Sequence, residues 1–144
     1  MDHEPSHEEK EELFYSFFNR LAVTETSKMT EAERSLDLVY WYRLEVLNGG
    51  HLQYFHNQTV RGEEPYEACI IGLEGLGCGD VAGVLRCAVA IWHSKRRTAP
   101  WTLDEFSSEA MAGEFSKLDF EFYDLDAQLQ TRLEAAVLDL TKPT

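Results

Sequence analysis

Eight carboxylates crowd into the 23 residues from Asp104 to Asp126, and they are the densest group of side chains that could recognise a ligand. Lys117 is the single cation among them. A helix of this length is roughly 35 Å long, and one DNA strand carries about ten phosphates over that distance. The run therefore approaches the charge of one strand, although a solvated helix face fits it equally well. The predicted partner-binding residues are Asp104, Glu105, Glu109, Glu114, Asp119, Glu121, Asp124 and Asp126.

The charge of the whole chain agrees with this prediction. The sequence has 26 acidic and 13 basic residues and a formal net charge of -13. Such a balance disfavours direct binding of nucleic acid or of an anionic membrane, and it favours a basic protein surface as partner. Arg86 and the run Lys95-Arg96-Arg97 oppose the acidic field. They can pair with carboxylates of the same chain or of a second copy, so a homodimer stays an open alternative.

A second candidate site is the corner between two apolar segments, where Asn48 is followed by Gly49 and Gly50. Glycine adopts a positive φ without a steric penalty, and asparagine tolerates it better than most residues. A tight helix–turn–helix corner is the favoured interpretation. Glu45 is expected to be partly buried there and to need hydrogen-bond donors. The alternative is a small-molecule pocket at the corner, but the glycines do not fit a phosphate-binding loop motif.

The segment Glu45–Asn57 reads EVLNGGHLQYFHN. It resembles the E-x-x-N-G-G-F-x-Q-[YF]-F-x-N core of a bacterial domain family of unknown function. The best understood member of that family is an acidic DNA-mimic protein. The resemblance extends from about Leu36 through the last helix, and His51 stands where the family usually has an aromatic residue. The resemblance implies an all-helical domain, and it implies that some members bind a DNA-binding protein through a carboxylate-rich surface. The motif residues are expected to be structural: Glu45, Asn48, Gly49, Gly50, Gln53, Tyr54, Phe55 and Asn57.

Conventional catalytic and metal-binding patterns are weak. The three cysteines, Cys69, Cys78 and Cys87, lie nine residues apart each time, which is not the spacing of a zinc site. Their odd number favours a reducing, cytoplasmic environment, and small buried thiols are the expected role. We predict no catalytic residue, no metal and no cofactor, and an enzyme is the less favoured class.

Apolar residues recur at spacings of three and four, which predicts a single all-α domain of about six to eight helices over residues 1–144, with residues 1–6 frayed. Ser6, Thr30 and Thr102 each precede an acidic residue by three positions, as helix N-caps do. Gln58–Glu64 is expected to be a loop, and Gly113–Asp124 has no clear period. The expected helices run from Ser6 to Ala22, Thr30 to Asn48, Leu52 to Asn57, Pro65 to Gly75, Asp80 to the basic run, Thr102 over a short stretch, and about Asp126 to Pro143.

Three functions remain open at this point. The first is an acidic protein-interaction module, with DNA mimicry toward a DNA-binding protein as its specific form. The second is an immunity-like or regulatory protein that binds a cationic toxin or enzyme. The third is a small-molecule binder or enzyme with a pocket at the Asn48-Gly49-Gly50 corner.

Overall fold

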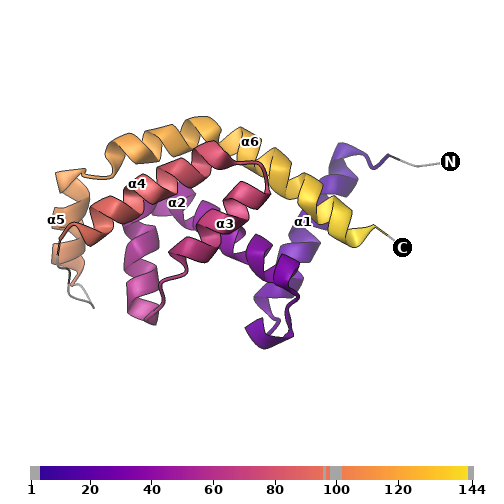
Figure 1. Ribbon diagram of the computed structural model, residues 1–144, viewed down its shortest axis with the longest axis horizontal. Helices are drawn as coiled ribbons and strands as arrows, with labels where there is room; N and C mark the ends of the chain where they lie inside the picture. The colour runs from indigo at the N-terminus through magenta and orange to yellow at the C-terminus, as the bar shows by residue number, and fades with distance from the viewer. Residues whose placement is uncertain (1–3, 96, 98–101, 143–144) are drawn as a thin grey trace.

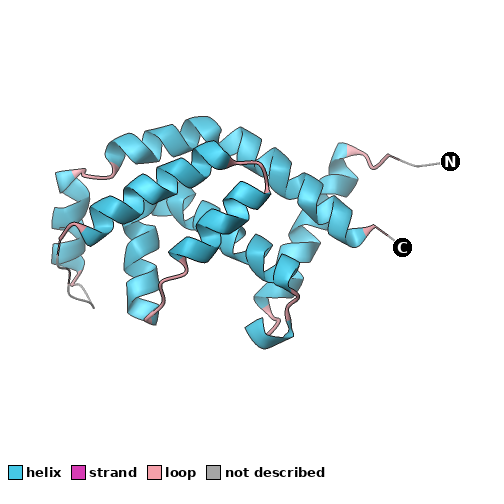
Figure 2. Cartoon of the chain, in the orientation of Figure 1, coloured by secondary structure: helices cyan, strands magenta, loops and turns pink. Residues whose placement is uncertain are grey.

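The computed structural model describes residues 4–95, 97 and 102–142, and these residues fold into one compact all-helical domain without strands (Figures 1 and 2). The predicted frayed terminus, 1–6, lies partly outside the described residues. None of the helices in the described ranges is both long and apolar enough to cross a bilayer. The six α-helices are α1 (His7–Ala22), α2 (Glu31–Arg61), α3 (Tyr66–Gly75), α4 (Gly79–His93), α5 (Leu103–Ala112) and α6 (Ser116–Thr141), with a short 3-10 helix, η1 (Thr26–Lys28), before α2.

The predicted caps begin three of these helices. The hydroxyl oxygens of Ser6, Thr30 and Thr102 accept hydrogen bonds from backbone N–H groups three residues later. At Thr30 the Glu33 side chain also accepts a hydrogen bond from the Thr30 backbone N–H, which completes a capping box. Each cap satisfies a backbone donor that the helix itself leaves without a partner.

Two helices are longer than the sequence predicted. α2 continues to Arg61 rather than stopping at Asn57, because Gln58 is buried and bonded within the fold and Gly62 ends the helix with a φ of 71°. α6 begins at Ser116, well before the expected start near Asp126. Its first turns place Leu118 and Phe122 in the core. Acidic and aromatic neighbours of these two residues hide their helical spacing in the sequence.

The core is aromatic and lies between α2 and the helices around it. α6 extends along the domain beside α4 and crosses α1, while α5 lies at the opposite end from α1 (Figure 1). Phe14, Phe18, Tyr42, Phe55 and Phe122 are almost completely buried, and many of the rings meet edge to face. Burial of large aromatic side chains supplies much of the free energy that holds such a domain together.

The predicted burial of the three cysteines needs correction. Cys69 and Cys78 are buried, but Cys87 is exposed on the solvent side of α4. In α3, Ala68 and Ile71 are exposed although the helix is apolar. Its buried face instead consists of Tyr66, Cys69, Ile70, Gly72 and Leu73. The nearly uniform apolar character of α3 leaves its inner side undefined until α2 and α4 pack against it.

Candidate interaction surface and the corner that supports it

The Asn-Gly-Gly corner is a sharp bend within α2. Gly49 has φ -153° and Gly50 has φ 76° with ψ -178°, so the helix is interrupted and then resumes in a new direction. The positive φ of Gly50 with an extended ψ is a conformation that glycine alone adopts readily. A Cβ atom on Gly50 would also lie 2.5 Å from Asp119 Oδ2. The corner therefore needs glycine for both backbone conformation and space.

Beyond the bend, Leu52, Tyr54 and Phe55 fold back into the core. The ring of Tyr54 meets that of Tyr42 edge to face, with centroids 4.9 Å apart. Glu45 is buried, with a relative exposure of 7%. Its two carboxylate oxygens accept hydrogen bonds from Asn57 Nδ2 at 3.1 Å and Gln58 Nε2 at 2.9 Å. Residues 45, 57 and 58 thus join the two limbs of α2 across the bend. The sequence predicted that Glu45 needs donors, and the structure identifies them as the side-chain amides of Asn57 and Gln58.

His51 connects the corner to α6. Asp119 Oδ1 lies 2.9 Å from the backbone nitrogen of His51 and 2.6 Å from its Nδ1. Because the carboxylate only accepts, Nδ1 carries the proton and Nε2 is left to accept the hydroxyl of Tyr42 at 2.7 Å. His51 has no exposed surface, so both ring nitrogens are used inside the fold. The ring acts as a polar tie between α2 and α6.

The acidic run divides into two groups in the folded chain. Four of its carboxylates make contacts inside the protein: Glu109 and Glu114 reach Arg97, Asp119 holds His51, and Asp126 pairs with Arg43. On α6, Asp119 and Asp126 are seven residues apart, or two turns, so both face α2. The remaining residues are exposed on α5 and α6: Asp104, Glu105, Glu121 and Asp124.

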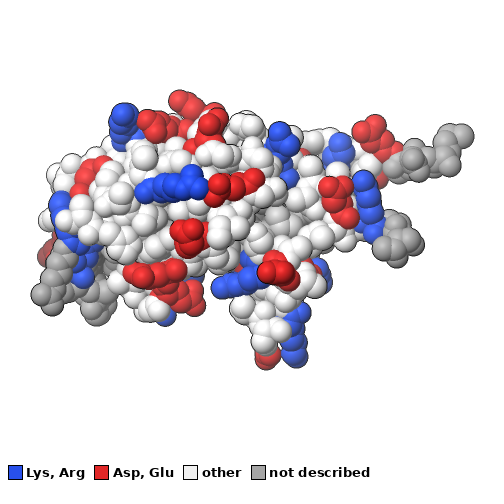
Figure 3. All heavy atoms as spheres, in the orientation of Figure 1, with Lys and Arg blue, Asp and Glu red and all other residues white. Residues whose placement is uncertain are grey.

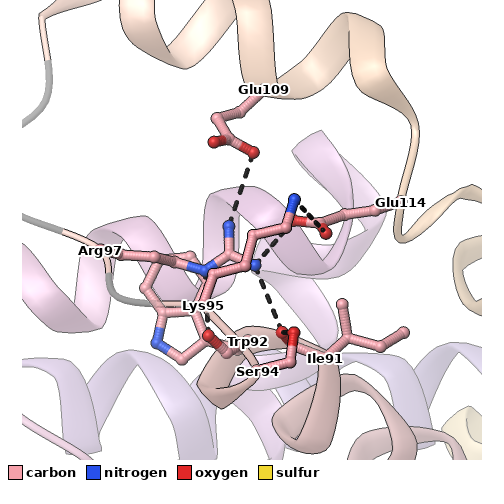
Figure 4. Close-up of polar contacts among 7 residues, drawn as sticks. All are labelled: Ile91, Trp92, Ser94, Lys95, Arg97, Glu109 and Glu114. Carbon is pink, nitrogen blue, oxygen red and sulfur yellow. Dashed lines mark hydrogen bonds and ion pairs between the residues drawn. The ribbon is translucent and has the colours of Figure 1, made fainter.

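Arg97 is the centre of the contacts at the α5 end of the domain (Figure 4). Only 6% of its side chain is exposed, and its guanidinium lies 4.5 Å from the ring centroid of Trp92. It donates to the carbonyl oxygens of Ile91 and Trp92, and to Glu114 at 2.7 Å. Burial raises the pKa of Glu114, but hydrogen bonds from Arg97 and Lys95 outweigh that effect and lower it overall. These contacts fasten the start of α6 to the end of α4.

Arg43 makes the second such attachment. Its Nε and Nη2 atoms donate to the two oxygens of Asp126 at 2.7 and 3.0 Å. Residues 43 and 126 are 83 positions apart in sequence, and the side chains of both are largely buried. A two-point contact between a guanidinium and a carboxylate fixes orientation as well as distance. It therefore sets the position of α6 against the first limb of α2.

Exposed carboxylates remain after this pairing. The carboxylates of Asp104, Glu105 and Asp124 accept no hydrogen bond and form no ion pair within the described part of the chain. The amine of Lys117 reaches Glu121 only at 3.9 Å. In the space-filling view, acidic atoms cover part of the edge formed by α6, basic atoms lie on the same edge, and both signs are mixed over the rest of that face (Figure 3). Of the predicted basic cluster, Arg86 pairs with Glu74 on α3, and Lys95 pairs with Glu114 while its side chain stays exposed. Arg97 is buried, and Arg96 lies outside the described residues.

A small cavity of about 100 Å³ lies next to the corner, lined by Gly49 and by parts of α5 and α6. The carboxylates in its wall are Glu109, Glu114 and Asp119, each with the internal partner described above. Among the described residues, no group of histidine, cysteine and acidic side chains has the arrangement of a metal site. The carboxylates in the wall of this cavity thus already have partners in the protein itself.

The family of the chain follows from a sequence comparison over most of its length. The family model described as DMP19-like protein matches residues 27–139, which include α2 to α5, all but the last two residues of α6, and the whole acidic run. No curated protein and no solved structure matches the chain. Because the match covers well over half of the sequence, the chain belongs to the DMP19-like protein family.

Proposed function

We propose that this chain is an acidic protein-interaction module that binds the basic surface of a DNA-binding protein, in the manner of a DNA mimic. Membership of the DMP19-like family is consistent with this type of module. The net charge of -13 gives the electrostatic attraction toward a cationic partner. The predicted contact residues are the exposed part of the acidic run, Asp104, Glu105, Glu121 and Asp124.

One observation carries the proposal: half of the acidic run faces solvent while the other half holds α5 and α6 in place. Arg97 and Arg43 bind the internal carboxylates, so the helices that carry the exposed ones are attached at two points. A charged surface that is fixed before binding loses less conformational entropy when a partner arrives.

The test is a competition experiment. A purified DNA-binding protein with a basic surface is bound to fluorescent duplex DNA, and displacement of the DNA by the acidic chain is followed by anisotropy. A panel of such proteins is needed because the partner is chosen by surface charge. We expect displacement by at least one of them, with an affinity that falls by tenfold or more between about 50 and 200 mM salt.

A fourfold variant with Asn and Gln in place of the carboxylates defines the surface. It changes Asp104, Glu105, Glu121 and Asp124. At about 0.3–0.7 kcal/mol for each exposed charge, binding should weaken by roughly 1–3 kcal/mol, or about 5- to 150-fold. The matched control removes the same number of exposed, unpaired charges elsewhere: Glu31, Glu64, Glu67 and Asp80. If both variants weaken binding equally, net charge alone explains the binding, and the four residues do not form a specific contact surface. An affinity that does not change with salt would contradict the proposal.

A further inference from the structure

A second cleft lies far from the acidic run, in the angle between the two limbs of α2. Its volume is about 220 Å³, smaller than the roughly 300–1,000 Å³ of pockets for drug-sized ligands. The first limb contributes Asp37 and Trp41, and the second contributes Gln58. The remaining lining residues are Arg34, Leu38, Tyr54, Arg61, Glu63 and Pro65. The bend at Gly50 creates this angle, so the motif corner shapes the cleft without lining it.

Asp37 is the unusual group in the cleft. It is 7% exposed, and its Oδ1 atom is buried without a hydrogen-bond partner. Its other oxygen, Oδ2, lies 3.8 Å from Arg34 Nη1, which is beyond hydrogen-bond distance. Burial raises the pKa of Asp37, whereas the charge of Arg34 and a side-chain hydrogen bond from Trp41 lower it, so the missing donor concerns the Oδ1 atom alone. Buried carboxylate oxygens nearly always have donors, so a ligand that brings one would complete this site.

Cationic groups line the same cleft. Arg61 is exposed at the end of α2 and donates no hydrogen bond within the described part of the chain. The Arg34 side chain is 39% exposed, and its contact with Asp37 is long. Guanidinium groups bind carboxylates through two parallel hydrogen bonds when an acceptor is available. Trp41, which is 40% exposed, supplies an aromatic surface between the charges.

We propose that the cleft binds a free α-amino acid, with the ammonium group at Asp37 and the carboxylate at Arg61. A simple cation would be repelled by Arg34 and Arg61, and a simple anion would be repelled by Asp37 and Glu63. A zwitterion satisfies both signs at once, and the aromatic wall accommodates an apolar or aromatic side chain. This site is independent of the acidic run, because none of its lining residues belongs to that run.

Calorimetric titration with each of the twenty common L-amino acids tests the proposal. At least one should give saturable binding with a Kd of about 1 mM or tighter. For the tightest ligand, the matching amine without the carboxylate and the matching acid without the amine should each bind at least tenfold more weakly. No saturable binding at about 10 mM of any amino acid would overturn the inference, as would equal binding of either analogue.

Three variants locate the site. Asp37→Asn and Arg61→Gln should each weaken the tightest ligand at least tenfold, whereas Glu67→Gln, outside the cleft, should bind as the wild type does. Circular dichroism checks that all three retain their helices. Arg61 is exposed, so Arg61→Gln should not disturb the fold. This variant therefore tests the binding site even if Asp37→Asn unfolds the protein. Wild-type affinity in Arg61→Gln would place the carboxylate elsewhere and refute the assignment.

Discussion

Replacing Asp119 with alanine tests whether the contact between α6 and the corner stabilises the fold. Oδ1 of Asp119 is the acceptor for two donors of His51, at 2.9 and 2.6 Å, and His51 is fully buried. Each donor left without a partner costs about 1–3 kcal/mol. Asp119→Ala should therefore lower the free energy of unfolding by about 4 kcal/mol, within a range of roughly 2–6. In a domain of this size that corresponds to a fall in Tm of about 8–16 °C.

Urea denaturation followed by circular dichroism measures this change. The matched control is Asp124→Ala on the same helix, where the carboxylate is exposed and unpaired, and its effect should stay within about 0.5 kcal/mol. Asp119→Asn keeps one acceptor oxygen but loses the negative charge, so its cost should lie between the two. If Asp119→Ala and Asp124→Ala unfold at the same urea concentration, then Asp119 is a surface charge like the others. The tie through His51 would then contribute nothing to stability.

The remaining predictions concern the bend of α2. Gly50→Ala should lower the free energy of unfolding by about 3 kcal/mol or more, because it adds a collision with Asp119 to a backbone penalty of about 1–3 kcal/mol. Gly62→Ala, also at positive φ but with no atom within 4 Å of its added Cβ, should cost only about 1–2 kcal/mol, and equal losses in urea denaturation would remove the steric argument. Burial raises the pKa of Glu45 above the ordinary 4.5, so the unfolded chain releases this proton first and ionisation lowers stability as pH rises above 4.5. The stability difference between wild type and Glu45→Gln should therefore shift against the wild type between about pH 4 and pH 7 in denaturation curves, and a difference independent of pH would contradict the assigned burial effect.

The sequence by itself determined the features that depend on near neighbours. Ser6, Thr30 and Thr102 start helices because each cap hydroxyl meets a backbone N–H three residues away. The Gly49-Gly50 pair predicted the bend because tolerance of a positive φ, which Gly50 adopts, is a property of glycine itself. The periodic apolar residues gave the all-α class, and the composition gave the net charge.

Tertiary structure decided which acidic residues face solvent. Asp119 meets His51 across 68 positions, and Asp126 meets Arg43 across 83, so no local pattern distinguishes them from Glu121 and Asp124. The early start of α6 was hidden for a related reason: its inner face is set by packing against α2 rather than by a clear period. Asp37 is likewise an ordinary helix carboxylate in the sequence. Its burial follows only from the bend, which brings two distant limbs of one helix together around it.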